Sequence, residues 1–90
     1  MMAPAYVRNG RLDILAANTL GAALYSPVLA DSTGTANMAR FIFLNPRASE
    51  FFDSWENIAH DAVAILRAEA GRDRYDKRLS DLIGELSTRS

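Results

Sequence analysis

Short runs of apolar and polar residues at the start of the chain predict a β-hairpin that leads into a helix. The dipeptide Asn9-Gly10 follows an extended apolar segment and favours a type I′ turn, in which both central positions need a positive φ angle. The second strand is expected over residues 12–16. Asn18 is then placed to be the N-cap of a helix that opens at Thr19.

Two breaks separate this opening from the rest of the chain. The first helix is expected to end at Ser26-Pro27, because the residue before a proline avoids the α conformation. Residues 31–35 read DSTGT and contain turn formers with almost nothing to bury. They predict a surface loop.

The most apolar segment, residues 38–44, fits either a buried strand or a buried helix by its periodicity. Asn37 before it and Asn45-Pro46 after it favour a short helix. Residues 47–52 predict a further helical turn.

The longest predicted helix begins with Asp53 as its N-cap, has Glu56 as a capping-box partner and runs to about Ala70. Gly71 is placed to close it at the C′ position. One face of this helix is apolar and consists of Trp55, Ile58, Ala59, Ala62, Ile65 and Leu66. A last helix, over about residues 77–87, is expected to bury Leu79, Leu82, Ile83 and Leu86. The fold class is therefore α+β, mostly helical with one N-terminal β-hairpin.

Composition and charge narrow the classes of function. The chain has 90 residues, 49% of them hydrophobic, which suits one small domain with a real core. Its formal net charge of -1 comes from interspersed acids and bases, so no basic surface for DNA or for an anionic membrane is expected. The chain shows no signal peptide pattern and no apolar run of the roughly 18 residues that span a bilayer. We expect a cytoplasmic protein without membrane contact.

The residues offer little catalytic chemistry. His60 is the only histidine and the chain has no cysteine, so a metal site would lack its usual ligands. Asp53 and Glu56 are explained by the helix start, and Asp61 has no evident catalytic partner. Neither a nucleophile motif nor a glycine-rich phosphate loop is present in the sequence. We expect a protein that is not an enzyme and needs no cofactor or metal.

Several motifs resemble the ligand-binding domain of MmyB-like transcription regulators, which lies behind a helix-turn-helix domain. They cover most of the chain in the expected order: PAYV at 4–7, RLDILAAN at 11–18, NMAR at 37–40, FLNP at 43–46, DSWE at 53–56 and LIGELSTRS at 82–90. The family usually has Asp at the position of Asn45.

The resemblance implies a PAS-like sensor that regulates transcription and holds a fatty-acid-like ligand in an apolar pocket. In the family, further strands follow the segment that ends here at Ser90, and a DNA-binding domain precedes Ala3. Residues 1–90 are therefore expected to be the front part of a sensor domain, which would reach DNA only through that separate domain.

The expected ligand contacts come mainly from apolar residues. The candidates are Ile14, Ala16, Leu20, Leu24, Phe41, Phe43, Leu44, Phe52 and Trp55, which equally suit an ordinary core. Arg40 interrupts the most apolar segment and, on a helix, would share a face with Phe43 and Leu44. It is placed either to bind a ligand carboxylate or to lie along the surface with its stem buried.

Two hypotheses remain open from the sequence. The first is a regulatory domain that binds an apolar small molecule. The second is a dimerisation or interaction module with a filled core and no ligand. Because a two-stranded hairpin leaves open edges, we expect the chain to form a homodimer or a higher self-associated state through strand pairing or an exchanged element.

Overall fold

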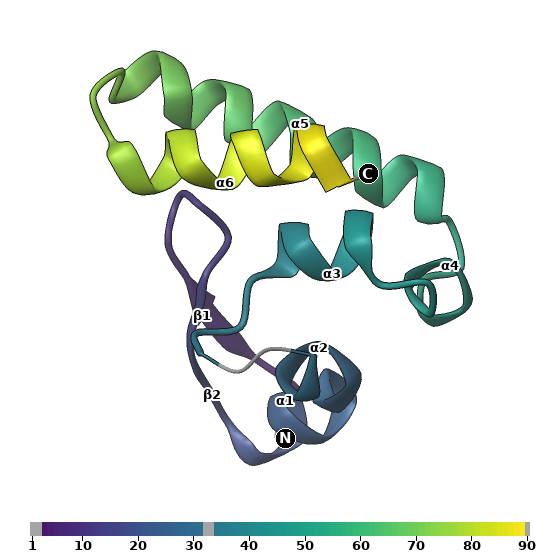
Figure 1. Ribbon diagram of the computed structural model, residues 1–90. Coiled ribbons are helices and arrows are strands. Elements are labelled where there is room, and N and C mark those ends of the chain that lie inside the picture. Colours follow the sequence, from purple (N-terminus) through teal and green to yellow (C-terminus); the bar gives the residue numbers. More distant parts are fainter. Residues whose placement is uncertain (1–2, 32–33, 90) are drawn as a thin grey trace.

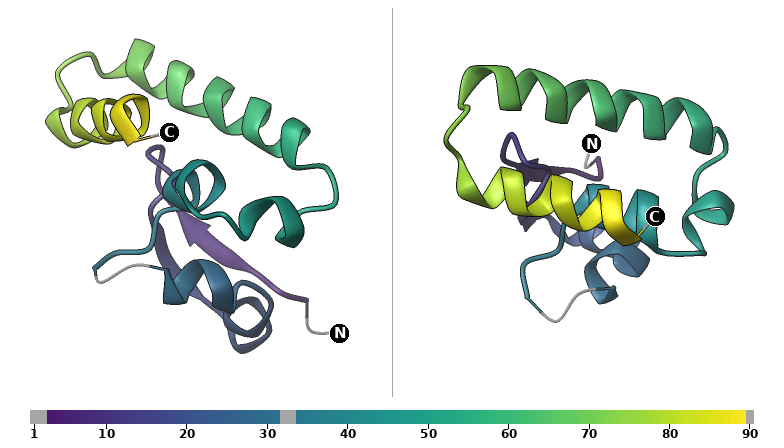
Figure 2. Two further views of the ribbon diagram at one scale, coloured as in Figure 1. Left: turned by 45° about the vertical axis from the view of Figure 1, so that its right-hand side comes forward. Right: turned by 45° about the horizontal axis from the view of Figure 1, so that its top comes forward.

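The computed structural model describes residues 3–31 and 34–89 and confirms the predicted α+β architecture (Figure 1). Its elements are β1 (Tyr6–Arg8), β2 (Ile14–Ala17), α1 (Thr19–Leu24), α2 (Ser26–Ala30), α3 (Met38–Leu44), α4 (Ala48–Phe51), α5 (Trp55–Arg72) and α6 (Lys77–Arg89). Helices α5 and α6 run antiparallel, side by side, at one end of the molecule, and the hairpin with α1 and α2 forms the other end (Figures 1 and 2). Helix α3 lies between these two parts. The loop predicted over residues 31–35 falls partly outside the described residues.

The hairpin exists, but its predicted type I′ turn is wrong. No described glycine has a positive φ angle, and the left-handed residue is Leu12, with φ 69°. The Asn9 side chain causes the difference, because its Oδ1 accepts hydrogen bonds from the backbone N–H groups of Arg11 and Asp13, each at 3.0 Å. This wider loop delays the second strand to Ile14 and places the Leu12 side chain in the core.

Gly10 does not serve the turn by a positive φ angle, but its missing side chain leaves room for the end of the Glu69 side chain. A Cβ atom on Gly10 would lie 2.2 Å from the carboxylate of Glu69 on α5. The same loop pairs with the chain just before α3: Ile14 N–H donates to the Ala36 carbonyl at 2.8 Å, and Met38 N–H donates to the Leu12 carbonyl at 2.9 Å. The hairpin loop therefore contacts the chain just before α3 on one side and α5 on the other.

Helix α1 begins as predicted, with Asn18 Oδ1 accepting from Gly21 N–H at 2.7 Å. It also ends as predicted, before Ser26 and Pro27. These two residues then start α2, which the sequence reading missed. Proline is compatible with a first helical turn, since the N–H that it lacks would have no partner there.

The segment before Asn45 is a helix, α3, as favoured above, and Asn37 caps it: its Oδ1 accepts from Arg40 N–H at 3.0 Å. Phe41 is fully buried and makes edge-to-face contacts with Phe51 and Phe52 from α4 and its C-cap. The core between α3, α5, α6 and the hairpin consists of Leu12, Ile14, Met38, Ala39, Phe41, Ile42, Ala59, Ala62, Leu66, Leu79 and Leu82. The predicted apolar face of α5 is thus confirmed.

The predicted helix ends need correction. The N-cap of α5 is Ser54, and no side chain makes a capping hydrogen bond there. Its first turn is instead anchored by Trp55, whose Nε1 donates to the Ile42 carbonyl of α3 at 2.9 Å. Gly71 lies inside the last turn, because α5 continues to Arg72. On α6, the expected burial of Ile83 is wrong, since its side chain is 38% exposed.

Candidate functional site

The structure divides the predicted ligand contacts among three places. Ile14 and Phe41 are buried in the core. Exposed positions at the end formed by β2 and α1 are occupied by Ala16, Leu20 and Leu24. The remaining residues, Arg40, Leu44, Phe43, Phe52 and Trp55, are partly buried around α3. The predicted set therefore does not line one common pocket.

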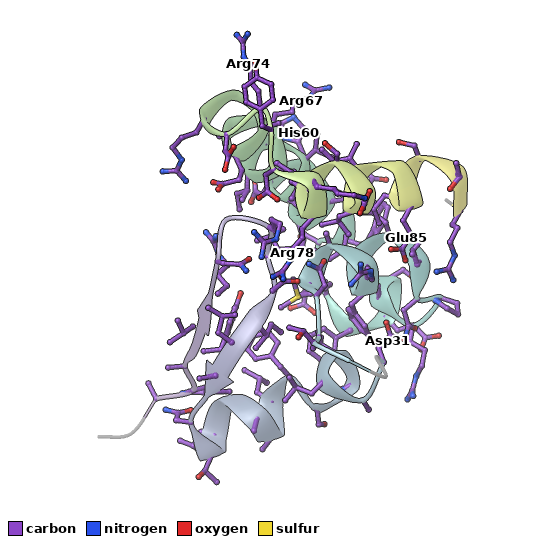
Figure 3. The ribbon with its side chains drawn as sticks, turned by 60° about the vertical axis from the view of Figure 1, so that its left-hand side comes forward. Asp31, His60, Arg67, Arg74, Arg78 and Glu85 are labelled. Atoms are coloured by element: carbon purple, nitrogen blue, oxygen red, sulfur yellow. The ribbon has the colours of Figure 1, made fainter. Side chains whose placement is uncertain are left out.

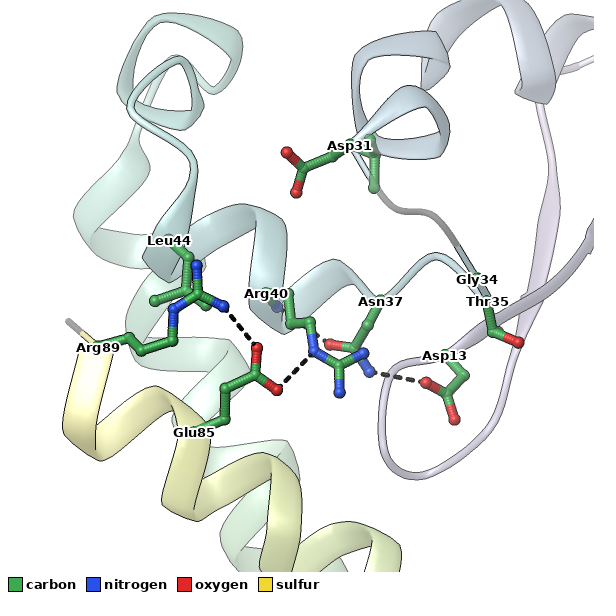
Figure 4. A pocket seen from close by; sticks show the side chains of 10 residues that line it. Asp13, Asp31, Gly34, Thr35, Asn37, Arg40, Leu44, Glu85 and Arg89 are labelled. Atoms are coloured by element: carbon green, nitrogen blue, oxygen red, sulfur yellow. Dashed lines mark hydrogen bonds and ion pairs between the residues drawn. The ribbon is translucent and has the colours of Figure 1, made fainter.

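Arg40 and Leu44 line a polar cavity of about 490 Å³ between the hairpin loop, α2, α3 and α6 (Figure 4). Its lining also includes Asp13, Val28, Asp31, Thr35, Asn37, Glu85 and Arg89. An adjoining hollow of about 280 Å³ shares Arg40, Asn37 and Asp13 and adds Arg78 and Asp81 from α6. We call the two together the polar cavity.

Asn37 organises the wall of the polar cavity between the hairpin loop and α3. Its side chain is buried, and its Nδ2 donates to Asp13 Oδ1 at 2.9 Å and to the Arg11 carbonyl at 2.8 Å. Its Oδ1 is the cap of α3 that receives Arg40 N–H. One amide side chain thus fixes the positions of the hairpin loop, the start of α3 and the Arg40 backbone relative to one another.

Ion pairs extend this network to α6. Arg40 Nε donates to Glu85 Oε1 at 2.9 Å, and Glu85 Oε2 accepts from Arg89 at 3.1 Å (Figure 4). Near the other end of α6, Arg11 Nη1 lies 3.1 Å from Asp76 Oδ2, and Arg11 Nη2 lies 3.3 Å from Asp13 Oδ2. The polar cavity is consequently bordered by charged side chains that hold three separate elements together.

The charge on Asp13 is favoured by its surroundings. Burial raises the pKa of this carboxyl, but hydrogen bonds from Asn37 and Asn9 and the positive charge of Arg11 outweigh it and lower the pKa below its ordinary value. The pKa of Asp76 is also lowered, first by the hydrogen bond from Leu79 N–H and further by Arg11. Both carboxylates are therefore acceptors at neutral pH.

Phe43 lies on the other side of α3 and lines a separate apolar groove of about 380 Å³. The groove runs between α5 and α6 and is lined by Phe43, Val63, Leu66, Arg67, Ala70, Ile83, Leu86 and Ser87. An open hollow of about 660 Å³ adjoins it along α5 and is lined also by Ala59, His60 and Ala64. Trp55 packs edge-on against Phe43, with ring centroids 6.3 Å apart, and so supports its position.

Arg67 and His60 are the basic groups beside the apolar groove. Both are exposed on α5 and project on the side away from the hairpin (Figure 3). In the described part of the chain, Arg67 has no hydrogen-bond or ion-pair partner. His60 lies in no metal-binding group, since residues 3–31 and 34–89 contain no cluster of three or more His, Cys, Asp or Glu side chains.

Sequence reasoning missed most groove residues and most acids of the polar cavity. The groove could have been found from Val63, Leu66 and Ala70, which recur at helical spacing on α5, together with Ile83 and Leu86 on α6. On α6, Asp81, Glu85 and Arg89 are spaced four residues apart and share a face. The pairing of Glu85 with Arg40 could not be read from spacing alone, because it joins residues from distant parts of the chain.

Comparison with known proteins identifies a family for this sequence. No curated protein and no solved structure matches the chain significantly. Within the part that the structure describes, no helix has the length and hydropathy needed to cross a membrane. The sequence matches the family described as "MmyB-like transcription regulator ligand binding domain" over residues 1–90. The chain therefore belongs to the family of ligand-binding domains of MmyB-like transcription regulators.

Proposed function

We propose that the chain is the PAS-like sensor part of a cytoplasmic helix-turn-helix transcription regulator and that it binds a fatty-acid-like molecule in the apolar groove. The observation that carries this proposal is an apolar groove with a single unpaired guanidinium, that of Arg67, in its lining. Such a site is complementary to an alkyl chain that ends in a carboxylate.

The size of the groove is compatible with a medium-chain fatty acid. Its volume of about 380 Å³ lies within the range of small-molecule sites, which span about 300–1,000 Å³. About a dozen buried methylene groups contribute on the order of 10 kcal/mol, at about 0.8 kcal/mol each. Association costs several kcal/mol, so micromolar binding can follow from burial of the chain alone.

The regulatory effect follows from where the groove lies. Its walls come from α3, α5 and α6, so a bound alkyl chain would contact all three elements. A ligand shifts an equilibrium between two packings by its difference in affinity for them. Occupancy of the groove would favour one arrangement of α6 and pass this change to the DNA-binding domain of the regulator.

Exposed apolar residues on the hairpin support a second candidate function, dimerisation. Val7 and Leu15 are 58% and 59% exposed, and within the described residues the sheet has only the strands β1 and β2. The start of β2 is covered by the chain just before α3, whereas among the described residues no strand pairs with the outer edge of β1, which is open to pairing with a second copy of the chain. Sedimentation of the wild type beside Val7→Lys and Leu15→Lys tests this function: a dimer that dissociates in the variants supports it, and a monomeric wild type contradicts it.

Dodecanoate binding to the 90-residue chain, followed by calorimetry and by the rise in Tm, tests the proposed ligand. Ile83→Gln in the groove should weaken binding about tenfold, because it removes apolar surface from the lining. Leu24→Gln is the matched control, since Leu24 is an exposed apolar residue at the opposite end of the molecule. Arg67→Gln should weaken binding several-fold, whereas Arg47→Gln should not.

Two results would contradict the ligand proposal. Absence of any rise in Tm at saturating dodecanoate would exclude an apolar ligand site. Equal weakening by Leu24→Gln and Ile83→Gln would show that the groove is not where the ligand binds.

A further inference from the structure

The guanidinium of Arg40 has hydrogen-bonding capacity that the protein does not use. An arginine side chain has five N–H donors, arranged as a planar fork. Only Nε of Arg40 is engaged, by Glu85, and among the described residues Nη1 and Nη2 have no partner. In Figure 4 the guanidinium lies in the open centre of the polar cavity, between α6 and the hairpin loop. A planar oxyanion can therefore approach the free edge of this group.

A second guanidinium belongs to the same cavity. Arg78 at the start of α6 lines the smaller hollow together with Arg40, and its side chain has no partner within the residues that the structure describes. The nearby Asp81 does not neutralise it, because that carboxylate lies 3.2 Å from Lys77. Two arginines with free donors, the half-buried Arg40 and the exposed Arg78, thus line one open polar hollow.

Acceptors border the same space. Asp13 Oδ2 accepts from Asn9 and lies against Arg11, whereas its Oδ1 accepts only from Asn37 among the described residues, which leaves a further lone pair on Oδ1. The hydroxyl group of Thr35 lies in the same lining. A ligand held here by its anionic group would therefore also meet acceptors for a hydroxyl or amino hydrogen.

We propose that the polar cavity binds a small hydrophilic carboxylate that also carries a hydroxyl or amino group. Arg40 and Arg78 hold the carboxylate, and Asp13 accepts a hydrogen bond from the hydroxyl or amino group. This site is separate from the apolar groove, because Glu85 and Arg78 face the polar cavity whereas Ile83 and Leu86 face the groove on the other side of α6. Ligand binding at this site is independent of the proposed sensor function, and only its regulatory consequence rests on that function.

The negative charge of Glu85 opposes the binding of an anion at this site. The ligand carboxylate at the free edge of Arg40 and the Glu85 carboxylate at Nε carry like charges on one guanidinium, so they repel each other and binding weakens the link between α3 and α6. Removing the charge of Glu85 should consequently strengthen ligand binding. A purely structural role of Glu85 would have the opposite effect, because loss of the ion pair would only loosen the site.

Calorimetric titration of the 90-residue chain with L-malate tests the proposal. We expect saturable millimolar or tighter binding, weakened about tenfold by Arg78→Gln and by Arg40→Lys, which keeps the charge but loses the planar fork. Glu85→Gln should tighten binding several-fold. Arg47→Gln is the matched control, because Arg47 is an exposed arginine outside the cavity. Ile83→Gln should leave malate binding intact while it impairs dodecanoate binding, so the two binding sites are tested independently.

Each contrary result has a definite meaning. Absence of saturable malate binding in a chain whose circular dichroism shows it to be folded would overturn the proposal. So would equal losses in Arg78→Gln and Arg47→Gln, or weaker binding to Glu85→Gln than to the wild type. Tighter binding of inorganic phosphate than of malate would contradict the assignment to carboxylates.

Discussion

The polar cavity and the apolar groove lie on opposite sides of α6 and are maintained by different forces. The cavity depends on hydrogen bonds and ion pairs between residues of the hairpin loop, α3 and α6, with Asn37 and Arg40 at its centre. The groove is shaped by apolar side chains of α3, α5 and α6. Directional bonds fail when one partner is removed, whereas apolar packing loses free energy roughly in proportion to the area lost. The polar side should therefore be far less tolerant of substitution.

The largest expected effect is that of Asn37→Ala on stability. This substitution removes the cap of α3 and leaves Asp13 and the Arg11 carbonyl without a hydrogen bond from Asn37. Loss of an N-cap costs about 1 kcal/mol, and the lost hydrogen bonds to the partly buried Asp13 carboxylate and Arg11 carbonyl add about 1 kcal/mol each. We expect a decrease of about 3 kcal/mol in the free energy of unfolding, measured by urea denaturation.

Asn57→Ala is the matched control, because Asn57 is exposed on α5. It should change stability by less than about 0.5 kcal/mol. Similar losses in both variants would show that Asn37 is not the centre of the polar network.

A smaller effect should appear as a pH dependence of stability. The folded-state pKa of Asp13 lies below its ordinary value of 3.8, so this carboxylate stabilises the fold above that pH and loses its contribution as the pH falls through the folded-state pKa. Denaturation at a series of pH values should show wild-type stability falling more steeply below about pH 4 than that of Asp13→Asn. Asp61→Asn, an exposed change on α5, should follow the wild type. Parallel curves for all three proteins would contradict the role of Asp13.

Local signals in the sequence predicted the helical side of the molecule better than the polar cavity. The caps Asn18 and Asn37 and the apolar face of α5 each depend on residues close together in the chain, and all three are confirmed. The hairpin turn was mispredicted because Asn9 binds two backbone groups of its own loop, and Gly10 there faces the end of the Glu69 side chain. A turn preference that is based on dipeptides does not take such contacts with other residues into account.

In the candidate site, too, local features were predicted and contacts between distant residues were not. Arg40 stands out in the sequence as a charge within an apolar segment, and the structure places it in a polar cavity with Leu44. Its partner Glu85 lies 45 residues further along the chain, so no spacing rule connects them. Phe43, which was expected to share a face with Arg40, instead lines the apolar groove, because neighbouring positions on the short helix α3 face different elements.

The smallest expected effect concerns the Arg40–Glu85 ion pair itself. Both side chains are partly exposed, so the pair contributes only about 0.5 kcal/mol to stability, and salt screens it. Glu85→Gln removes this pair together with the exposed Glu85–Arg89 pair, so it should lower the free energy of unfolding by about 0.5–1 kcal/mol at low ionic strength and by less in concentrated salt. Glu56→Gln, an exposed change in the first turn of α5, tests whether this response is specific to the pair, by urea denaturation at two salt concentrations. A loss of several kcal/mol in Glu85→Gln would mean that the ion pair is a main support of the fold, and a ligand carboxylate could not replace Glu85 without unfolding the domain.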